Sequence, residues 1–249
     1  MLRVEGVSRN FGGLMAVNNI SMSVEPGERR AIIGPNGAGK TTFFNLLSGE
    51  MPPAQGRIYL GEQDITSLPS YGRARLGIGR TFQRNNLFLN STVFENIRLA
   101  SQSRAGISHR AFAPIERFAS LQEETEQFLE RFDLQELADI PARNLSYGDQ
   151  RQLEVAVTLA THPRVLLLDE PTAGMSPAET TTMTDMIRDM PRDITLLVIE
   201  HDMDVVFGLA DRITVLHYGE VIADGTPEEV QGDPRVMEVY LGLDQGLHI

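Results

Sequence analysis

Short aliphatic runs alternate along this chain with segments of helical periodicity. Strands are predicted at residues 2–7, 16–27, 31–33 and 56–65, where apolar and polar positions alternate or an apolar run is bounded by Gly and Pro. After a glycine-rich turn, the segment TTFFNLLS has the pattern of a helix that ends at Gly49. The first third of the chain is therefore predicted to combine strands with at least one buried helix.

From about residue 84 to 162 the periodicity is helical. Within residues 116–132, apolar side chains fall on one face at 3.6 residues per turn, namely Phe118, Leu121, Phe128, Leu129 and Phe132. Residues 149–163 predict a second helix, which ends at a proline. The middle of the chain is predicted to be a helical lobe.

The alternation of strands and helices resumes after this lobe. Strands are predicted at residues 164–170 and 195–201, a hairpin-like pair at 211–225, and a helix at 178–190. That helix has an apolar face formed by Met183, Met186, Ile187 and Met190. Buried strands that alternate with helices predict an α/β fold with a mostly parallel sheet. The helical lobe is inserted between the two halves of that sheet.

The composition excludes several classes of protein. The 249 residues carry a formal net charge of −12 and contain no Cys and no Trp. A disulfide scaffold and a thiolate metal site are therefore excluded, and a pI near 4.9 argues against a nucleic-acid partner. No segment has the pattern of a signal peptide or the roughly 20 apolar residues of a membrane helix. We expect a cytoplasmic chain whose membrane connection comes through a partner.

The charge is distributed unevenly. Residues 1–84 hold 10 of the 22 basic side chains but 6 of the 34 acidic ones, so a polyanionic ligand would favour this third of the chain. Lys40 is the single lysine of the sequence, and the other basic residues are arginines. A preference for arginine codons accounts for most of this bias. The position of the one lysine still needs a chemical reason.

A phosphate-binding motif supplies that reason. Residues 34–41 match the pattern G-x-x-x-x-G-K-[ST], with a predicted strand before it and a helix after it. In such a loop, backbone N–H groups and the helix N-terminus surround phosphate oxygens, a lysine reaches the β/γ-phosphates, and a Ser or Thr hydroxyl binds Mg²⁺. A compact ammonium suits this closed site better than a guanidinium. The predicted nucleotide-binding residues are Gly34, Pro35, Asn36, Gly37, Ala38, Gly39, Lys40, Thr41 and Thr42.

Two carboxylates follow the aliphatic run at residues 165–168. A strand of this kind is buried, so Asp169 and Glu170 are expected at the carboxyl edge of the sheet, where open α/β sheets bind ligands. We predict that Asp169 binds Mg²⁺, together with Thr41. Glu170 is placed to polarise the attacking water. The alternative for either acid alone is a helix cap, which the upstream phosphate loop makes the weaker interpretation.

The segment Leu145-Ser-Tyr-Gly-Asp-Gln150 opens the helix that leads to these acids, and Ser146 is a plausible N-cap. In its position between the phosphate loop and the two acids, it resembles the LSGGQ signature of the ATP-binding cassette (ABC) ATPases of ABC transporters. The resemblance covers essentially the whole chain. It implies a P-loop ATPase with a RecA-like, mostly parallel core sheet, an antiparallel β subdomain and an inserted helical subdomain.

The resemblance also implies a domain division and roles for further residues. Residues 1–249 form one ABC ATPase domain, with the nucleotide-binding core at 1–83 and 163–235, the helical subdomain at 84–162 and a tail at 236–249. Phe11 matches the family's aromatic residue that stacks on adenine. Gln83 matches the glutamine that takes part in catalysis and contacts Mg²⁺, and His201 matches the catalytic histidine that is called the switch histidine. The alternatives are that Phe11 is an aromatic residue of a turn, that Gln83 is an ordinary loop amide, and that His201 is a capping or core histidine.

Residues 146–149 and 173–176 match two motifs that the family uses across a dimer interface. Ser146 and Gly148 match the positions that contact ATP held by the opposite subunit. Tyr147 and Asp149 replace the usual Gly and Gln, and Ser176 replaces the usual Asp at the end of the motif at residues 173–176. Since Ser146 and Gly148 are kept, we expect the closed dimer to form, whereas Ser176 lacks the carboxylate that the family uses at this position.

The resemblance further implies a function in transport. The segments RTFQRNNLFLNSTVFENI, YGDQRQLEVA, IEHDMDVV and VMEVYLG are similar to one ATPase of the Liv-type branched-chain amino acid importers. Such an ATPase binds ATP and Mg²⁺ and forms a homo- or heterodimer with another cassette. It works with two transmembrane permease subunits and a periplasmic or extracellular substrate-binding protein, as a peripheral protein on the cytoplasmic face of the inner membrane. The alternatives are a urea or amide importer and a lipopolysaccharide-type exporter; a soluble ABC ATPase without a transporter fits the length less well.

Four arginines flank the glutamine motif: Arg73, Arg75, Arg80 and Arg84. The simpler interpretation is a solvated basic surface. The alternative is that they dock an acidic segment of the permease.

Overall fold

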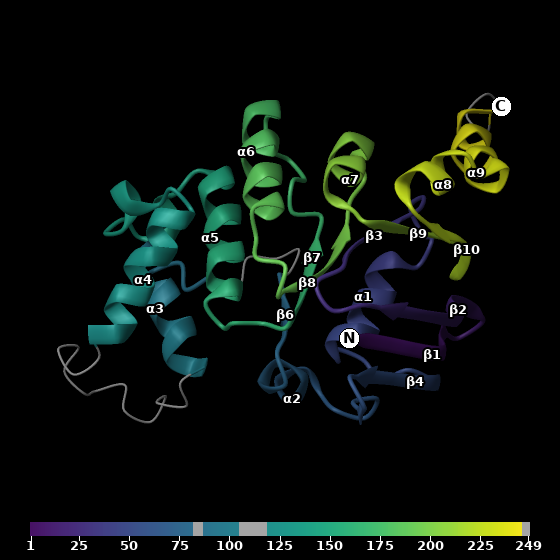
Figure 1. The fold of residues 1–249 in the computed structure, drawn as a ribbon, viewed down its shortest axis with the longest axis horizontal. Coiled ribbons are helices and arrows are strands. Elements are labelled where there is room, and N and C mark those ends of the chain that lie inside the picture. The colour runs from purple at the N-terminus through teal and green to yellow at the C-terminus, as the bar shows by residue number, and fades with distance from the viewer. Residues whose placement is uncertain (82–86, 105–118, 246–249) are drawn as a thin grey trace.

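The computed structural model describes residues 1–81, 87–104 and 119–245, and it has two β-sheets that share one helix between them (Figure 1). The six-stranded sheet has the order β10-β9-β3-β8-β7-β6, and only β10 runs antiparallel to its neighbour. Its strands are β3 (Arg29–Ile33), β6 (Ile78–Arg80), β7 (Val165–Asp169), β8 (Thr195–Ile199), β9 (Arg212–His217) and β10 (Glu220–Gly225). The predicted mostly parallel core sheet is confirmed.

The four-stranded sheet is antiparallel and has the order β2-β1-β4-β5. Its strands are β1 (Leu2–Phe11), β2 (Leu14–Val24), β4 (Gln55–Leu60) and β5 (Gln63–Asp64). Residues 56–65 were predicted as one strand, which was wrong because the chain reverses at Gly61. That glycine has φ +60° and its N–H donates to Met1 O at 2.8 Å. The strand is therefore divided into the hairpin of β4 and β5.

Helix α1 (Lys40–Ser48) is buried between the two sheets. Its apolar residues Phe43 and Phe44 are fully buried in a cluster that contains Leu2 and Val4 of β1 and Val165 and Leu167 of β7. A helix that is apolar on several faces needs such a two-sided environment. The phosphate loop at its N-terminus is thereby fixed between the sheets.

The other face of the parallel sheet is covered by helices. Leu166 and Leu168 of β7 point into a second cluster with Leu153 of α5 (Tyr147–Leu159) and with Met183 and Ile187 of α6 (Pro177–Arg188). The predicted Met-rich face of α6 is therefore confirmed. Because β7 is covered on both faces, its run of aliphatic residues shows no alternation. Helix α7 (Met203–Leu209) covers the same face farther along the sheet.

The helical segments of the middle of the chain lie together at one end of the molecule (Figure 1). They are α3 (Val93–Arg104), α4 (Ala119–Arg131) and two short 3₁₀ helices, Gln135–Leu137 and Ala142–Asn144. Leu121, Leu129 and Phe132 of the predicted apolar face are buried, and Phe128 packs against the same cluster. Phe118 lies outside the described residues. The limits of this subdomain, 84–162, stay a prediction.

The described residues also contain the helices α2 (Ser70–Arg75), α8 (Pro227–Gln231) and α9 (Pro234–Gln245). The described part of the predicted C-terminal tail belongs to α9, which packs on the core through Val236 and Tyr240. Across the described ranges, no helix combines the length and the apolar character needed to cross a lipid bilayer.

Candidate nucleotide-binding and hydrolysis site

The glycine-rich loop connects the end of β3 to the start of α1. Residues 34–39 form the loop, and Lys40, Thr41 and Thr42 form the first turn of the helix. Gly34 has φ +146° and Gly39 has φ +101°. A Cβ atom would lie 2.1 Å from Leu216 O at position 34 and 2.2 Å from Ala16 O at position 39. Only glycine permits this close packing.

The N-terminus of α1 has no side-chain cap, because its N-cap residue is Gly39. The first N–H groups of a helix have no partner within the helix, and its dipole is positive at this end. One hydrogen bond from a neighbouring segment and one within the loop hold it in place. Gly219 of the β9–β10 turn donates to Ala38 O at 2.9 Å, and Ala38 donates to Pro35 O at 3.1 Å. The loop thus has the geometry of an anion-binding site.

Lys40 is folded against the loop that precedes it. Its Nζ donates to Gly34 O at 2.6 Å and to Pro35 O at 3.0 Å, and the residue is 6% exposed. Burial lowers the pKa of this amine, and the carboxylates of Glu170 and Asp169 oppose that shift. An ammonium has three donors, so one remains for a phosphate oxygen.

Asp169 ends β7 and is 1% exposed. Its Oδ2 accepts a hydrogen bond from Arg80 Nη2 at 3.0 Å. Within the described residues its buried Oδ1 has no hydrogen-bond partner. Burial raises the pKa of this carboxyl, the Glu170 charge adds to the shift, and Arg80 opposes it. A buried acceptor without a partner indicates a missing donor or cation at this point.

This orphaned oxygen fits Mg²⁺. No group of three or more His, Cys, Asp or Glu side chains within the described ranges could hold a metal on its own. Mg²⁺ keeps several waters and is usually bound by one or two carboxylates together with substrate phosphates. Asp169 is therefore a suitable protein ligand, with the hydroxyl of Thr41 on the first turn of α1 as the second predicted one. Gln83, predicted as the third, lies outside the described residues.

Glu170 and His201 are brought together from the ends of neighbouring strands β7 and β8. His201 Nε2 lies 2.7 Å from Glu170 Oε1. Both side chains are partly exposed, at 46% for His201 and 26% for Glu170. Glu170 has φ +52°, and its N–H donates to Ile199 O at 2.9 Å. A non-glycine residue at positive φ is a strained conformation that is concentrated at functional sites.

Glu200 is a buried acid beside this pair that sequence reasoning missed. It is 3% exposed and accepts hydrogen bonds from Thr172 N at 3.1 Å, Thr172 Oγ1 at 2.7 Å and His201 N at 3.1 Å. Burial raises the pKa of its carboxyl, and these three hydrogen bonds oppose the shift. Glu200 joins the loop after Glu170 to the segment of His201. The sequence signal was an acid that directly follows the buried strand TLLVI.

Ser146 and Ser176 are both helix N-caps. Ser146 Oγ accepts from Asp149 N at 3.1 Å and donates to Asp149 Oδ2 at 2.7 Å at the start of α5. Ser176 forms a capping box with Glu179 at the start of α6. The unusual Asp149 and Ser176 therefore both have a structural role. The contacts of Ser146 and Gly148 with a phosphate stay predictions.

Phe11 lies at the end of β1 and is 46% exposed. The Arg9 guanidinium carbon lies 5.3 Å from the centre of its ring. Leu14 and Met15, at the start of β2, are exposed beside it. An exposed aromatic face with apolar neighbours is suited to stacking on a purine. Its contact with adenine stays a prediction.

The interpretation of the four arginines as a solvated or docking surface is wrong for two of them. Arg73 is fully buried and donates to the carbonyl oxygens of Leu46, Leu47, Thr66 and Leu68. It therefore binds the C-terminal end of α1, and burial lowers its pKa to about 10. Arg80 is paired with Asp169. Arg75 is exposed, and Arg84 lies outside the described residues.

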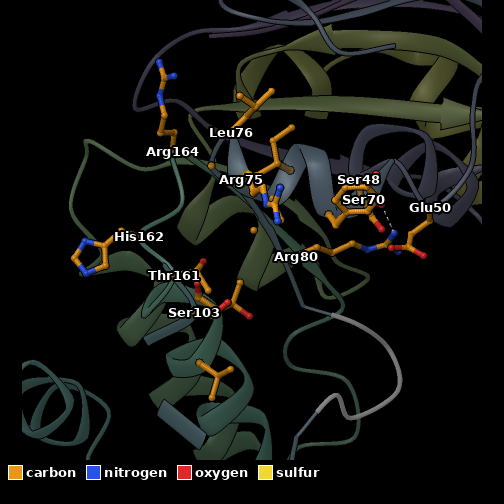
Figure 2. A pocket seen from close by; sticks show the side chains of 17 residues that line it. Ser48, Glu50, Ser70, Arg75, Leu76, Arg80, Ser103, Thr161, His162 and Arg164 are labelled. Carbon is orange, nitrogen blue, oxygen red and sulfur yellow. Dashed lines mark hydrogen bonds between the residues drawn. The ribbon is translucent and has the colours of Figure 1, made fainter. Parts of the chain in front are cut away.

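A hollow of about 860 Å³ lies beside these arginines (Figure 2). It runs along α2 and β6 to the C-terminal end of α5, and its lining includes Tyr71, Arg75, Arg80, His162 and Arg164. The hollow is thus bounded by the parallel-sheet core and by the helix that carries the signature segment. A ligand or protein segment bound there would contact both.

Two family models match different parts of the chain. The family described as "ABC transporter" matches residues 17–173, and the one described as "Branched-chain amino acid ATP-binding cassette transporter" matches residues 220–244.

Two relatives and one solved structure are similar over nearly the whole chain. The high-affinity branched-chain amino acid transport ATP-binding protein LivG of Escherichia coli K12 is 43% identical over 97% of this chain and 98% of its own length. The lipopolysaccharide export system ATP-binding protein LptB of Acidithiobacillus ferridurans is 36% identical over 97% of each chain. The ADP conformation of MJ1267, an ATP-binding cassette of an ABC transporter, has a TM-score of 0.85 and 31% identity, and the match covers 97% of this chain and 98% of that one.

Proposed function

We propose that this chain, which belongs to the ABC transporter family of ATP-binding cassettes, is the ATP-hydrolysing subunit of an importer for branched-chain or related amino acids. The observation that carries the proposal is the end-to-end similarity to an ATP-binding protein named for branched-chain amino acid transport, at 43% identity. The separate match of residues 220–244 to a family of the same description supports it.

ATP binding is assigned to the preformed loop. Backbone N–H groups of the loop after Pro35 and of the first turn of α1, together with the third donor of Lys40, hold the β- and γ-phosphates, and Phe11 stacks on the adenine. Asp169 and Thr41 hold Mg²⁺, with Gln83 as the third predicted contact. When bound, Mg²⁺ neutralises the charge that the transferred phosphoryl group carries. The buried Oδ1 of Asp169 supports this assignment.

Hydrolysis is assigned to Glu170 and His201. Glu170 accepts a proton from the attacking water, whose oxygen forms a bond to the γ-phosphorus while the bond to the bridging oxygen of ADP breaks and ADP leaves. His201 holds the Glu170 carboxylate through the 2.7 Å contact. Because Glu200 fixes both His201 N and Thr172, the two catalytic side chains are supported by one buried acid.

A complete site requires two cassettes. Ser146 and Gly148 lie at the start of α5, in a different part of the chain from the phosphate loop, and we assign them to the ATP of an opposing cassette. The partner is a second copy or a different cassette. ATP-dependent dimerisation of the Glu170→Gln variant, followed by light scattering, tests this step. A variant that stays monomeric at saturating ATP would contradict it.

We assign the docking site of the membrane partner to the hollow beside α2. Two transmembrane permease subunits, which serve a periplasmic or extracellular binding protein, would place the chain on the cytoplasmic face of the inner membrane. Tyr71 is 68% exposed and Arg75 is exposed, and both line the hollow. We expect Arg75→Glu to release the cassette from membranes while ATP binding persists. Unchanged membrane retention would contradict the assignment.

The substrate class is tested by uptake measurements in the organism that carries the gene. Deletion should abolish high-affinity uptake of labelled leucine, isoleucine and valine. The wild-type gene should restore uptake, whereas the Glu170→Gln variant should not. Loss of urea or amide uptake with normal amino acid uptake would identify the importer alternative instead.

Export is the second candidate, because LptB is 36% identical over 97% of this chain. If the chain belongs to an exporter, the deletion strain should show normal amino acid uptake and an altered cell envelope. The same deletion strain therefore separates the two candidates.

A further inference from the structure

The start of α5 and the segment between β7 and α6 are joined within this chain at Tyr147. The Tyr147 hydroxyl donates to Ala173 O at 3.0 Å. Its ring lies against Gly174, where a Cβ atom would be 3.3 Å from Tyr147 Cε1. Gly174 has φ +79°, so the segment turns at the point where the ring contacts it.

A second contact joins the same two segments one residue further along. A Cβ atom at Gly148 would lie 2.4 Å from Glu179 Oε1, so only glycine allows the Glu179 side chain to occupy this place. Glu179 in turn accepts from Ser176 N at 2.8 Å and from Ser176 Oγ at 2.7 Å. The segment 173–179 therefore lies close to the start of α5 at both of its ends.

The Tyr147 side chain is fixed although it is 47% exposed. Its hydroxyl accepts from Arg151 Nε at 3.2 Å while it donates to Ala173 O. Arg151 also donates to Glu154 at 2.8 Å, and the side chains of this pair are 8% and 6% exposed. The hydroxyl therefore uses both its donor and its acceptor function, and its position is set by a buried ion pair. A glycine, the usual residue here in the signature that this segment resembles, could not make this link.

The link continues to the catalytic acid over a short path. Ala173 N donates to Glu170 O at 3.2 Å, and Thr172 is bonded to Glu200, which holds His201 N. Tyr147 is therefore connected, through the single residue Ala173, to the turn that begins at Glu170. A shift of the start of α5 would be passed to that turn.

We propose that Tyr147 is a positioning residue that couples the two half-sites of this chain. The start of α5 is assigned to the ATP of the opposing cassette, and the segment after Glu170 to the chain's own ATP. The inference rests on the proposed function because it uses these two assignments. When the dimer closes on the ATP of the opposing cassette, Tyr147 would then align Glu170 and His201 at the chain's own ATP. The unusual tyrosine of the signature segment makes this connection inside one polypeptide.

The test compares Tyr147→Phe with wild type in the full-length cassette, assembled with its partner cassette if that is a different chain. Phe keeps the ring and removes the hydroxyl. We expect kcat to fall about tenfold, which corresponds to the loss of about one neutral hydrogen bond from the aligned state, and the Hill coefficient for ATP to fall toward 1. The affinity for ATP, measured by equilibrium binding, and the melting temperature should stay near the wild-type values. Tyr147→Gly should reproduce the loss.

Tyr59→Phe is the matched control, because Tyr59 is a tyrosine of the antiparallel sheet whose hydroxyl accepts from Arg57. It should keep wild-type kcat and Hill coefficient. Hydrogen exchange gives a second readout, since residues 170–176 should exchange faster in Tyr147→Phe than in wild type. Wild-type kcat, Hill coefficient and exchange in Tyr147→Phe would overturn the inference. A wild-type protein without ATPase activity would instead overturn the proposed function.

Discussion

Arg80 donates a hydrogen bond to Asp169 at the adjoining ends of β6 and β7, with Arg80 Nη2 3.0 Å from Asp169 Oδ2. The Arg80 side chain is 6% exposed and that of Asp169 is fully buried. Arg80 Nη1 also donates to Asn45 Oδ1 at 2.6 Å and to Ser48 Oγ at 2.9 Å, which are both on α1. One guanidinium therefore connects the predicted Mg²⁺ ligand to the helix that follows the phosphate loop.

We expect Arg80→Gln to lower the free energy of unfolding by about 3–5 kcal/mol, because removing one partner leaves the other charge of a buried pair without compensation. Urea denaturation with and without Mg²⁺ and ATP measures the loss. Arg75→Gln, at an exposed position five residues earlier, is the control and should change the stability by less than about 0.5 kcal/mol. Equal stabilities of wild type and Arg80→Gln would contradict the assignment of Arg80 to a buried pair.

Glu170→Gln should reduce steady-state ATP hydrolysis by at least about 100-fold, because an amide is a poor proton acceptor. ATP binding should persist, since Glu170 is not among the residues of the phosphate loop. Phosphate release and filter binding of labelled ATP measure the two properties separately. Hydrolysis at the native rate would show that another group acts as the base.

Lys40 should be the principal site of labelling by an amine-directed acyl phosphate of ATP. It is the single lysine of the chain, so the N-terminus is the other primary amine. Peptide mass spectrometry should place the label on Lys40, and excess ATP should prevent it. Lys40→Arg should leave at most the N-terminal label. A label that forms equally in the presence of excess ATP would argue against Lys40 as a phosphate contact.

Asp224 should contribute stability that depends on pH. Burial raises the pKa of its carboxyl, but the hydrogen bonds from Arg212 and Thr214 and the charge of Arg30 together lower it below the usual value. Thr214 Oγ1 lies 2.6 Å from Asp224 Oδ2. A depressed pKa in the folded state gives stability that is present above the unfolded pKa of about 3.9 and is lost as pH falls through the folded value.

Asp224→Asn should therefore lower the free energy of unfolding at pH 7 by about 1–3 kcal/mol, because it leaves buried donors of Arg30 poorly satisfied. The difference from wild type should shrink as pH falls below about 4, where the Asp224 carboxyl is protonated first in the unfolded state and, at lower pH, in the folded state. Urea denaturation across this range measures both effects. Glu62→Gln, in the exposed turn between β4 and β5, is the control, and a difference that does not change with pH would contradict the explanation.

The contiguous parts of the site were predictable from the sequence, because their chemistry depends on neighbours along the chain. Residues 34–41 were predicted as a phosphate loop because the glycines, the lysine and the following helix all lie in one segment, and the structure places them as a loop that leads into α1. Asp169 and Glu170 could be placed at a sheet edge because an unbroken aliphatic strand directly precedes them. The resemblance to a known signature supplied the function of Ser146 and Gly148 as an expectation.

The contacts between distant segments were decided by the tertiary structure. Arg80 meets Asp169, and Thr172 meets Glu200, because β6, β7 and β8 are neighbours in the sheet. Tyr147 meets Ala173 because α5 packs beside the segment that follows β7. No local pattern of apolar and polar residues encodes strand order, so sequence reasoning placed Arg80 on the surface and left Glu200 unnoticed. The sequence determined which groups could do chemistry, and strand order and helix packing determined which of them meet.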